Sequence, residues 1–321
     1  MMNSVAAVIP SWNTAAYIER CLDSLDAQAG VSIETIVVDN GSTDASLELI
    51  KGRGVNFLSF SSNIGFAAAV NTGAAETYAP LVLVLNADCY LASDCLRRLV
   101  EELTAHGGLG GVQPRILQEA PPGAVARIYS TGQCLARRGA AFERGWGEPD
   151  GPRHTNRGEV FGVSGAACLL RRELFADVGG YDVAYFAFFE DVDLNARARL
   201  AGWRFAYVPD ARATHVGHAA WRQEPHAQRF VVELTVRNRL ATAFKVLPVR
   251  GVVGSLGLTL RSIAGGPLHG TSAAVLTGTL TALRWLPRLL GERRRLRSAS
   301  PQLLDDWLAL APGRGPNPAD I

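Results

Sequence analysis

The chain has 321 residues, of which 48% are apolar, and its formal net charge is only +2. This length allows one large domain or two smaller ones, and the apolar share allows a substantial hydrophobic core. The five cysteines include no C-x-x-C pair, which argues against a disulfide framework or a zinc site and favours a reducing compartment.

The first ninety residues alternate between short apolar runs and helical patterns. The runs predict strands over residues 5–9, 33–38, 55–60 and 81–85, and the segments between them predict helices over 17–28, 45–51 and 65–77. This alternation predicts a mostly parallel α/β sheet flanked by helices, in which ligands bind beyond the carboxyl ends of the strands. Four polar residues lie at or just past such ends: Asn13, Asp39, Asn63 and Asp88.

The pattern weakens after a predicted helix over residues 94–105. Residues 119–158 are rich in Gly, Pro and Arg and predict a long loop with short strands. Ordered structure is expected again over residues 160–170, followed by short helices over 173–178 and 191–200. A further strand over residues 203–208 is predicted to end before Pro209.

Two acidic clusters follow apolar runs and are about 100 residues apart, Asn86-Ala87-Asp88 and Glu190-Asp191-Val192-Asp193. Carboxylates beside apolar surface cost free energy unless they bind a cation or take part in proton chemistry. In an extended chain Asn86 and Asp88 point to the same side, and such oxygen ligands suit Mg²⁺ or Mn²⁺ with a nucleotide diphosphate. The clusters therefore predict a metal-dependent enzyme, although Asp88 alone could be a turn former.

Three carboxylates within four residues raise the pKa of at least one of them, which suits a general base that takes a proton from an alcohol. Capping of a helix start is the competing interpretation for Asp191 and, more strongly, for Asp193. Asp39 could bind a base or ribose or could cap a helix. His215 and His218 could complete a metal sphere or be ordinary loop residues.

The C-terminal part is unusually basic. Residues 1–236 carry 20 basic and 26 acidic residues, whereas residues 237–297 carry 11 basic residues and one acid. The 22 residues between Arg261 and Arg284 are uncharged, but they are too polar and too often interrupted by glycine to predict a membrane-spanning helix. Residues 284–297 predict a helix in the membrane interface, with arginines at lipid phosphates and Trp285, Leu286, Leu289 and Leu290 inserted. A plain helical subdomain or a solvated basic face is the alternative.

The motifs in this order resemble the family 2 glycosyltransferases of GT-A fold. The resemblance covers about residues 5–218 and rests on five segments: Ala7-Val8-Ile9-Pro10-Ser11-Trp12-Asn13, residues 37–44 around Asp39, Asn63-Ile64-Gly65-Phe66 with Asn71, Leu85-Asn86-Ala87-Asp88, and residues 189–194 around Asp191. The Asn-x-Asp variant, with residues 162–166 and 179–182, looks most like the bacterial rhamnosyltransferase subgroup. Members of that subgroup commonly use dTDP-L-rhamnose and build cell-wall or polysaccharide linkers.

The resemblance implies an inverting transfer of a sugar, L-rhamnose from dTDP-L-rhamnose, to a glycan or lipid-linked glycan acceptor. Asp191, beside Glu190, would be the catalytic base, and a divalent ion, Mg²⁺ or Mn²⁺, would be held by Asp88 and His215. The implied nucleotide-sugar-binding residues are Pro10, Ser11, Asn13, Asp39, Asn63, Gly65, Asn71, Asn86, Ala87 and Asp88. Because Asn86 replaces the commoner Asp, we expect weaker or more substrate-dependent metal binding.

The resemblance also implies a division of the chain. Residues 1–232 would form the catalytic domain, with a nucleotide-sugar half over 1–118 and an acceptor half over 119–232, and residues 233–321 a helical, basic extension. With no signal-peptide pattern at the N-terminus, we expect a cytoplasmic protein that is peripheral at the inner membrane.

Other functions fit the residues less well. A galactofuranosyl or other hexosyl transferase that uses a UDP-sugar remains an alternative. A sugar nucleotidyltransferase would want a Gly-rich loop and a lysine near the first strand, and a dehydrogenase would want G-x-G-x-x-G where Pro10-Ser11-Trp12-Asn13 stand. A non-catalytic nucleotide-sugar-binding protein would not need all three aspartates. Nucleic-acid binding lacks aromatic residues placed between the arginines.

Overall fold

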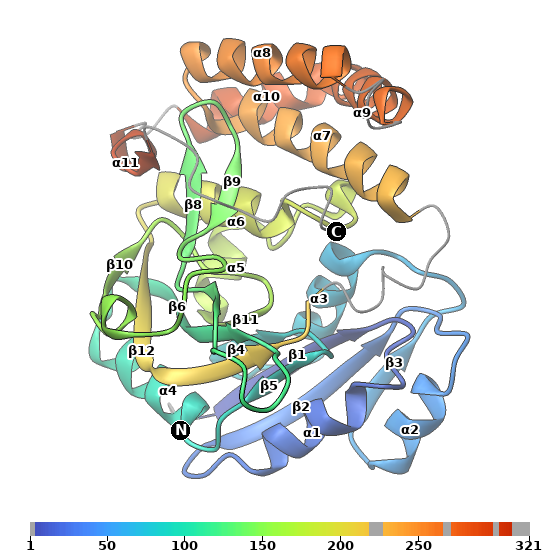
Figure 1. The fold of residues 1–321 in the computed structure, drawn as a ribbon, viewed down its shortest axis with the longest axis vertical. Coiled ribbons are helices and arrows are strands. Elements are labelled where there is room, and N and C mark those ends of the chain that lie inside the picture. The colour runs from blue at the N-terminus through green and yellow to red at the C-terminus, as the bar shows by residue number, and fades with distance from the viewer. Residues whose placement is uncertain (1–3, 218–226, 266–270, 298–301, 310–321) are drawn as a thin grey trace.

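The computed structural model describes residues 4–217, 227–265, 271–297 and 302–309. Its centre is a mixed sheet with the strand order β10-β12-β6-β11-β4-β1-β2-β3, with β5 paired to β12 and β7 to β6. Figure 1 shows this sheet at one end of the molecule and a layer of C-terminal helices at the other.

The first half of the sheet is parallel, as the alternating pattern predicts. Strand β1 (Ser4–Ser11) pairs with both β2 (Ser32–Asp39) and β4 (Leu81–Leu85), and β2 pairs with β3 (Asn56–Ser59). The intervening helices are α1 (Ile18–Asp26), α2 (Ser46–Gly52) and α3 (Phe66–Ala75). Alternate residues of β1 and β4 enter two hydrophobic cores on opposite faces of the sheet, which explains why both strands are apolar throughout.

The second half of the sheet is mostly antiparallel. Strand β11 (Ala167–Arg171) runs antiparallel to β4 and β6, whereas β6 and β12 are parallel to each other. The other elements here are β5 (Cys89–Leu91), α4 (Cys95–Ala105), β6 (Leu109–Gln118), β7 (Ile128–Ser130), β8 (Gln133–Ala136), β9 (Ala141–Glu143), η1 (Pro152–His154), β10 (Gly158–Val160), α5 (Arg172–Val178), η2 (Val183–Tyr185), α6 (Glu190–Leu200) and β12 (Arg204–His215).

Two strands of this half differ from the sequence-based expectation. No strand was predicted over residues 109–118, which form β6. A Cβ on Gly111 would lie 2.5 Å from a methyl of Leu170, so glycine is what lets the two strands pack closely. The predicted end of a strand at Val208 is wrong, since β12 continues to His215. An irregularity in its register between Val208 and Arg212 accommodates Pro209 within the strand.

The C-terminal helices form a separate layer (Figure 1). They are α7 (Ala227–Val246), α8 (Val249–Gly265), α9 (Ser272–Arg284), α10 (Leu286–Leu296) and α11 (Gln302–Asp305), followed by β13 (Leu308–Ala309). The β8–β9 hairpin rises from the sheet toward this layer, and β13 pairs with β8. Among the described residues, no helix combines the length and the apolarity needed to cross a membrane.

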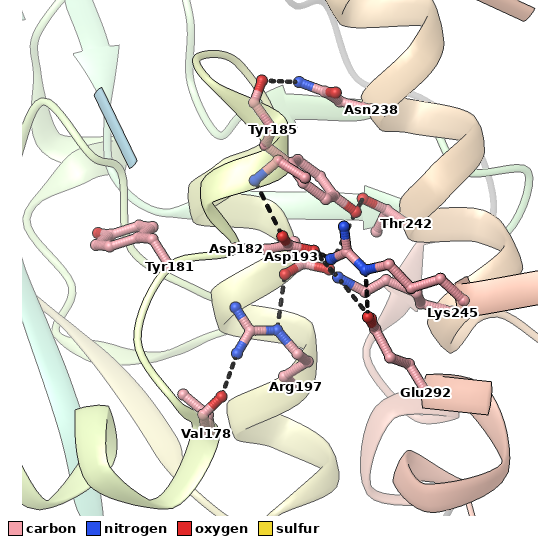
Figure 2. A network of polar contacts seen from close by, with 12 residues as sticks. Val178, Tyr181, Asp182, Tyr185, Asp193, Arg197, Asn238, Thr242, Lys245 and Glu292 are labelled. Atoms are coloured by element: carbon pink, nitrogen blue, oxygen red, sulfur yellow. Dashed lines mark hydrogen bonds and ion pairs between the residues drawn. The ribbon is translucent and has the colours of Figure 1, made fainter. Parts of the chain in front are cut away.

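A buried ionic network joins this layer to α6 and to the segment before η2, as Figure 2 shows. The Lys245 ammonium on α7, 1% exposed, lies 2.7 Å from Asp182 and 2.8 Å from Asp193, and 3.3 Å from Glu292 on α10. Arg197 pairs with Asp193 at 2.7 Å. Asp193 is fully buried in these contacts, so within the acidic cluster it has a structural role.

Most of the side chains expected to contact the membrane in residues 284–297 contact other parts of the same chain instead. Leu289 is fully buried in a core with Tyr185 and Leu240, and Trp285 and Leu286 pack against that core. Three arginines of the segment bond to carboxylates or backbone carbonyls of the same chain: Arg288, Arg293 and Arg297. The expectation that Leu289 inserts into lipid is therefore wrong, because helix packing buries it.

Candidate active site

A cavity of about 620 Å³ lies between the carboxyl ends of β1 and β4, the β8–β9 hairpin and helices α7 and α8. Residues of both acidic clusters line this cavity, although the clusters are about 100 residues apart in the sequence. The predicted site residues that line it are Pro10, Ser11, Asn63, Asn86, Ala87, Asp88, Glu190, Asp191 and His215. The fold thus brings together most of the residues that the sequence patterns singled out.

The first acidic cluster is held by the end of β12. The backbone N–H of Val216 donates to the carbonyl of Asp88 at 3.0 Å, and His215 is in register with Cys89 of β5. This pairing places His215 Nε2 3.0 Å from Asp88 Oδ1 and 3.3 Å from Asn86 Nδ2. The imidazole is 2% exposed and packs edge-on against Tyr129, with the ring centroids 4.4 Å apart. Asp88 and His215 therefore form a rigid carboxylate–imidazole pair at the cavity wall.

The second acidic cluster follows a strained loop. Phe186, Phe188 and Phe189 all have positive φ values of 66–67°, which non-glycine residues rarely adopt. The buried Asn238 amide of α7 donates to carbonyls of this loop at 2.7–2.9 Å, and one of these bonds is drawn in Figure 2. Strain of this kind persists only where surrounding contacts hold it, and it is frequent at functional sites. The loop leads directly into Glu190 at the start of α6.

Asp191 has the geometry of a general base. Its Oδ2 accepts hydrogen bonds from Gly165 N–H at 2.9 Å and from Gln133 Nε2 at 2.6 Å, while Oδ1 accepts one from Val192 N–H at 2.8 Å. Burial raises the pKa of Asp191 above its ordinary value, and the hydrogen bonds oppose that rise. The carboxylate is fixed in orientation, and Oδ1 retains acceptor capacity toward the cavity.

Glu190 lies in a different environment from its neighbour Asp191. Burial, and then the charge of Asp191, hold the pKa of Glu190 well above its ordinary value. Its Oε2 is buried and has no hydrogen-bond partner within the described part of the chain. The pKa of Asp191 is also raised by burial, but its hydrogen bonds from Gly165, Val192 and Gln133 oppose that rise.

Glu143 at the end of β9 is a cavity residue that sequence reasoning missed. Its carboxyl accepts hydrogen bonds from Ser130, from Ser164 at 3.2 Å and from Gln133 at 3.3 Å. Burial, with the charge of Asp191, raises the pKa of Glu143 to about 7. Gln133 Nε2 thus bridges Glu143 and Asp191. No local signal marked Glu143 or Gln133, because both lie in the segment over residues 119–158 that was expected to be a long loop.

Four predicted site residues lie outside the cavity lining of the described chain. Asp39 is buried at the end of β2, where its carboxylate accepts hydrogen bonds from Ser42 N–H at 3.4 Å and Ser59 Oγ at 3.2 Å. The Asn13 side chain accepts a hydrogen bond from Thr43 N–H at 2.8 Å. Both residues organise the turns next to the cavity, whose lining includes Asn40.

The other two have packing functions. Asn71 bonds both to the carbonyl and to the N–H of Tyr181, at 2.7 and 2.9 Å, and so ties α3 to the segment before η2. Gly65 has φ +89°, and a Cβ there would lie 2.7 Å from the Phe186 ring. His218 lies outside the described residues.

The chain has the GT-A fold, which it shares with two solved glycosyltransferases. The structure of GalNAc-T7 with UDP, GalNAc and Mn²⁺ has a TM-score of 0.61 at 14% identity, over 92% of this chain and 58% of that chain. The mannosyltransferase PcManGT from Pyrobaculum calidifontis, with GDP-Man and Mn²⁺, has a TM-score of 0.52 at 16% identity, over 94% and 87%.

The sequence comparison specifies the family. Residues 6–179 match the model for glycosyl transferase family 2, more than half of the chain, and the chain belongs to that family. It is 28% identical to the N-acetylglucosaminyl-diphospho-decaprenol L-rhamnosyltransferase of Mycobacterium tuberculosis (strain CDC 1551 / Oshkosh), over 67% of this chain and 76% of that protein. It is 25% identical to the poly-beta-1,6-N-acetyl-D-glucosamine synthase of Staphylococcus aureus (strain COL), over 65% and 48%.

Proposed function

We propose that this glycosyltransferase moves L-rhamnose from dTDP-L-rhamnose to a sugar hydroxyl of a lipid-linked glycan, with inversion at the transferred carbon. The observation that carries the proposal is the convergence of the Asp88–His215 pair and the Asp191 carboxylate on one cavity. The choice of rhamnose and of a lipid-linked acceptor rests on the similarity to the mycobacterial rhamnosyltransferase.

In the proposed reaction Asp191 takes the proton of the acceptor hydroxyl while that oxygen forms a bond to the anomeric carbon of the donor. The bond from the same carbon to the diphosphate oxygen breaks, and the nucleoside diphosphate leaves with that electron pair. Asp191 is suited to this step because Gly165, Gln133 and Val192 fix its orientation and burial raises its pKa toward the working range of a base.

The residues present fit a divalent cation. Asp88 Oδ1 and His215 Nε2 face each other at 3.0 Å, and a carboxylate with an imidazole suits Mn²⁺ or Mg²⁺. Among the described residues, no three His, Cys, Asp or Glu side chains are grouped as ion ligands. We propose that Asp88 and His215 would hold the ion. When bound, the ion would neutralise charge on the leaving diphosphate.

The donor is proposed to lie along the edge formed by β1, β2 and β4. Pro10, Ser11, Asn63 and Ala87 line the cavity there. Asp39 and Asn13 support the adjoining turns, which is consistent with a role in holding the base and ribose. We also propose that residues 1–232 form a catalytic domain and that residues 233–321 form a helical extension.

Contact with the cytoplasmic face of the inner membrane is proposed for the C-terminal helices. The exposed apolar residues of this layer lie on α8 and α9 more than on α10: Val249, Val253, Leu260, Leu276, Leu280 and Leu283, with Leu290 on α10. Exposed apolar residues gathered on neighbouring helices, in a region with excess arginine, suit a lipid surface.

The proposed function is tested by turnover of a panel of dTDP-, UDP- and GDP-sugars with Mn²⁺ or Mg²⁺. We expect hydrolysis of, and transfer from, dTDP-L-rhamnose, with loss of transfer in Asp191→Asn. Turnover of a UDP-sugar instead would keep the mechanism and replace the donor. Binding of nucleotide without turnover of any donor, in the presence of lipid acceptor, would contradict an enzymatic role.

A further inference from the structure

Arg239 on α7 is a buried cation with neutral partners. It is 8% exposed and lines the cavity described above. Its guanidinium donates to the backbone carbonyl and the hydroxyl of Ser255 at 3.0 and 2.8 Å, and to Thr259 Oγ1 at 2.6 Å. Among the residues that the structure describes, no carboxylate lies within 4.0 Å of it.

Two other buried cations, Lys245 on α7 and Arg197 on α6, are paired differently, whereas the buried Arg199 of α6 donates to the carbonyls of Val160 and Phe161 and has Glu159 4.0 Å away. Lys245 and Arg197 both lie beside Asp193, at 2.8 and 2.7 Å. A buried charge without a counterion costs several kcal/mol in typical cases. Burial lowers the pKa of Arg239 to about 10, so the side chain still carries its charge at neutral pH. An uncompensated cation at a cavity wall provides an attraction for an anion.

The cavity wall formed by α7 and α8 carries several apolar side chains, with Thr235 and Ser262 among them. Val232 and Val236 of α7 and Leu258 of α8 line the same cavity, and Phe189 lines it from the loop before α6. The opposite wall is the sheet edge that carries Asp88. A ligand that fits this side of the cavity combines one anionic group with an apolar chain.

We propose that Arg239 binds the phosphate or diphosphate that joins the acceptor sugar to its lipid, with the first carbons of the lipid against Val232, Val236 and Leu258. This proposal rests on the proposed function and adds the site at which the acceptor is recognised. The residue before it, Asn238, holds the loop that leads to Glu190 and Asp191. One turn of α7 therefore positions both the acceptor anion and the base.

The competing interpretation is a structural role, in which Arg239 only links α7 to α8 through Ser255 and Thr259. The test compares two acceptors with the same N-acetylglucosamine and the same lipid chain, joined through a diphosphate or directly as a glycoside. The variants are Arg239→Gln and Arg239→Lys in the full chain, with Arg250→Gln as the matched control, because Arg250 is an exposed arginine of the neighbouring helix.

We expect Arg239→Gln to raise KM for the diphosphate acceptor by on the order of tenfold or more, since charge-assisted hydrogen bonds contribute about 1.5–3 kcal/mol. KM for the glycoside and KM for the donor should not change. Arg239→Lys should fall between wild type and Arg239→Gln, and Arg250→Gln should match wild type. An equal rise in KM for both acceptors, or a rise in KM for the donor, would overturn the proposal.

A binding measurement separates this proposal from the proposed function. Farnesyl diphosphate and farnesol are titrated into wild type and Arg239→Gln with saturating dTDP and Mn²⁺, which occupy the donor site. Selective loss of farnesyl diphosphate binding in Arg239→Gln supports the anion site even if dTDP-rhamnose is not the donor. Equal binding of farnesyl diphosphate to both proteins overturns the anion site even if rhamnosyl transfer is observed. If phosphatidylglycerol vesicles bind wild type and Arg239→Gln equally, then residues other than Arg239 attract the protein to a lipid surface.

Discussion

The Nε2 atom of His215 lies 3.0 Å from Oδ1 of Asp88, although 127 residues separate the two in the sequence. The strand pairing of β12 with β5 brings them together, because His215 is in register with Cys89, the residue after Asp88. A carboxylate and an imidazole so placed can share a cation with the oxygens of a bound diphosphate.

Substitution of either member of this pair should weaken metal binding. We expect Asp88→Asn and His215→Gln each to lower the affinity for Mn²⁺ by on the order of tenfold or more, measured by titration in the presence of dTDP. Asp94→Asn, an exposed carboxylate on the surface of the same half, is the control. Because oxygens of a bound diphosphate would supply further ligands in the proposed site, Mn²⁺ should bind wild type more tightly with dTDP than without it. Equal affinities would contradict that dependence.

The variants Asp191→Asn and Glu190→Gln should differ sharply in kcat. Asp191→Asn removes the proton acceptor, and kcat should fall by roughly 10²–10⁴-fold while nucleotide binding is retained. Glu190→Gln resembles the protonated acid that burial already favours, so its effect on kcat should be much smaller. The check is steady-state transfer with both variants. A larger loss in Glu190→Gln would reverse the assignment of the base.

Glu143 should make stability depend on pH. Its pKa is raised to about 7 in the folded protein, so the folded state binds a proton more tightly than the unfolded state. The stabilisation is complete below the ordinary pKa of glutamate and is lost as pH rises through about 7, with a magnitude on the order of 3 kcal/mol.

Urea unfolding at pH 5 and pH 8 measures this effect. Wild type should lose more stability between the two values than Glu143→Gln, which has no proton to release at that position. Glu190 is present in both proteins, whereas Asp191 interacts with Glu143, so the difference between the two proteins reports Glu143 together with its interaction with Asp191. An identical pH dependence in the two proteins would show that Glu143 is ionised in the folded state.

Lys245 should be essential for stability. Lys245→Met leaves the buried carboxylates of Asp182 and Asp193 without their shared cation, and the free energy of unfolding should fall by about 3–5 kcal/mol. Lys51→Met is the matched control, because Lys51 is exposed on α2. Denaturant unfolding of both variants is the measurement, and equal midpoints would contradict a stabilising network.

The exposed apolar residues of α8 should promote vesicle binding. Val253 and Leu260 are seven residues apart on one helix face and are 62% and 67% exposed. The double variant Val253→Ser, Leu260→Ser should bind anionic liposomes several-fold more weakly in co-sedimentation. Val125→Ser removes an equally exposed valine from outside the C-terminal helices and should bind as wild type does. Unchanged binding of the double variant would exclude this face.

Local patterns predicted the first half of the sheet and the position of Asp88 well. Strands β1 and β4 are apolar on both faces because each face enters a core, and a run of five apolar residues is visible without any tertiary information. The same holds for the acidic residues that follow such runs, since their position after a strand places them at its carboxyl end.

Tertiary structure alone decided the rest. The reach of β12 to His215 depends on a register irregularity around Pro209, and the place of Glu143 beside Asp191 depends on a hairpin folding back over the sheet. The burial of Leu289 and the neutral partners of Arg239 depend on how the C-terminal helices pack. Sequence patterns report the surroundings of a residue along one element. Which side chains meet across elements is set by strand register and helix packing, and these are properties of the whole fold.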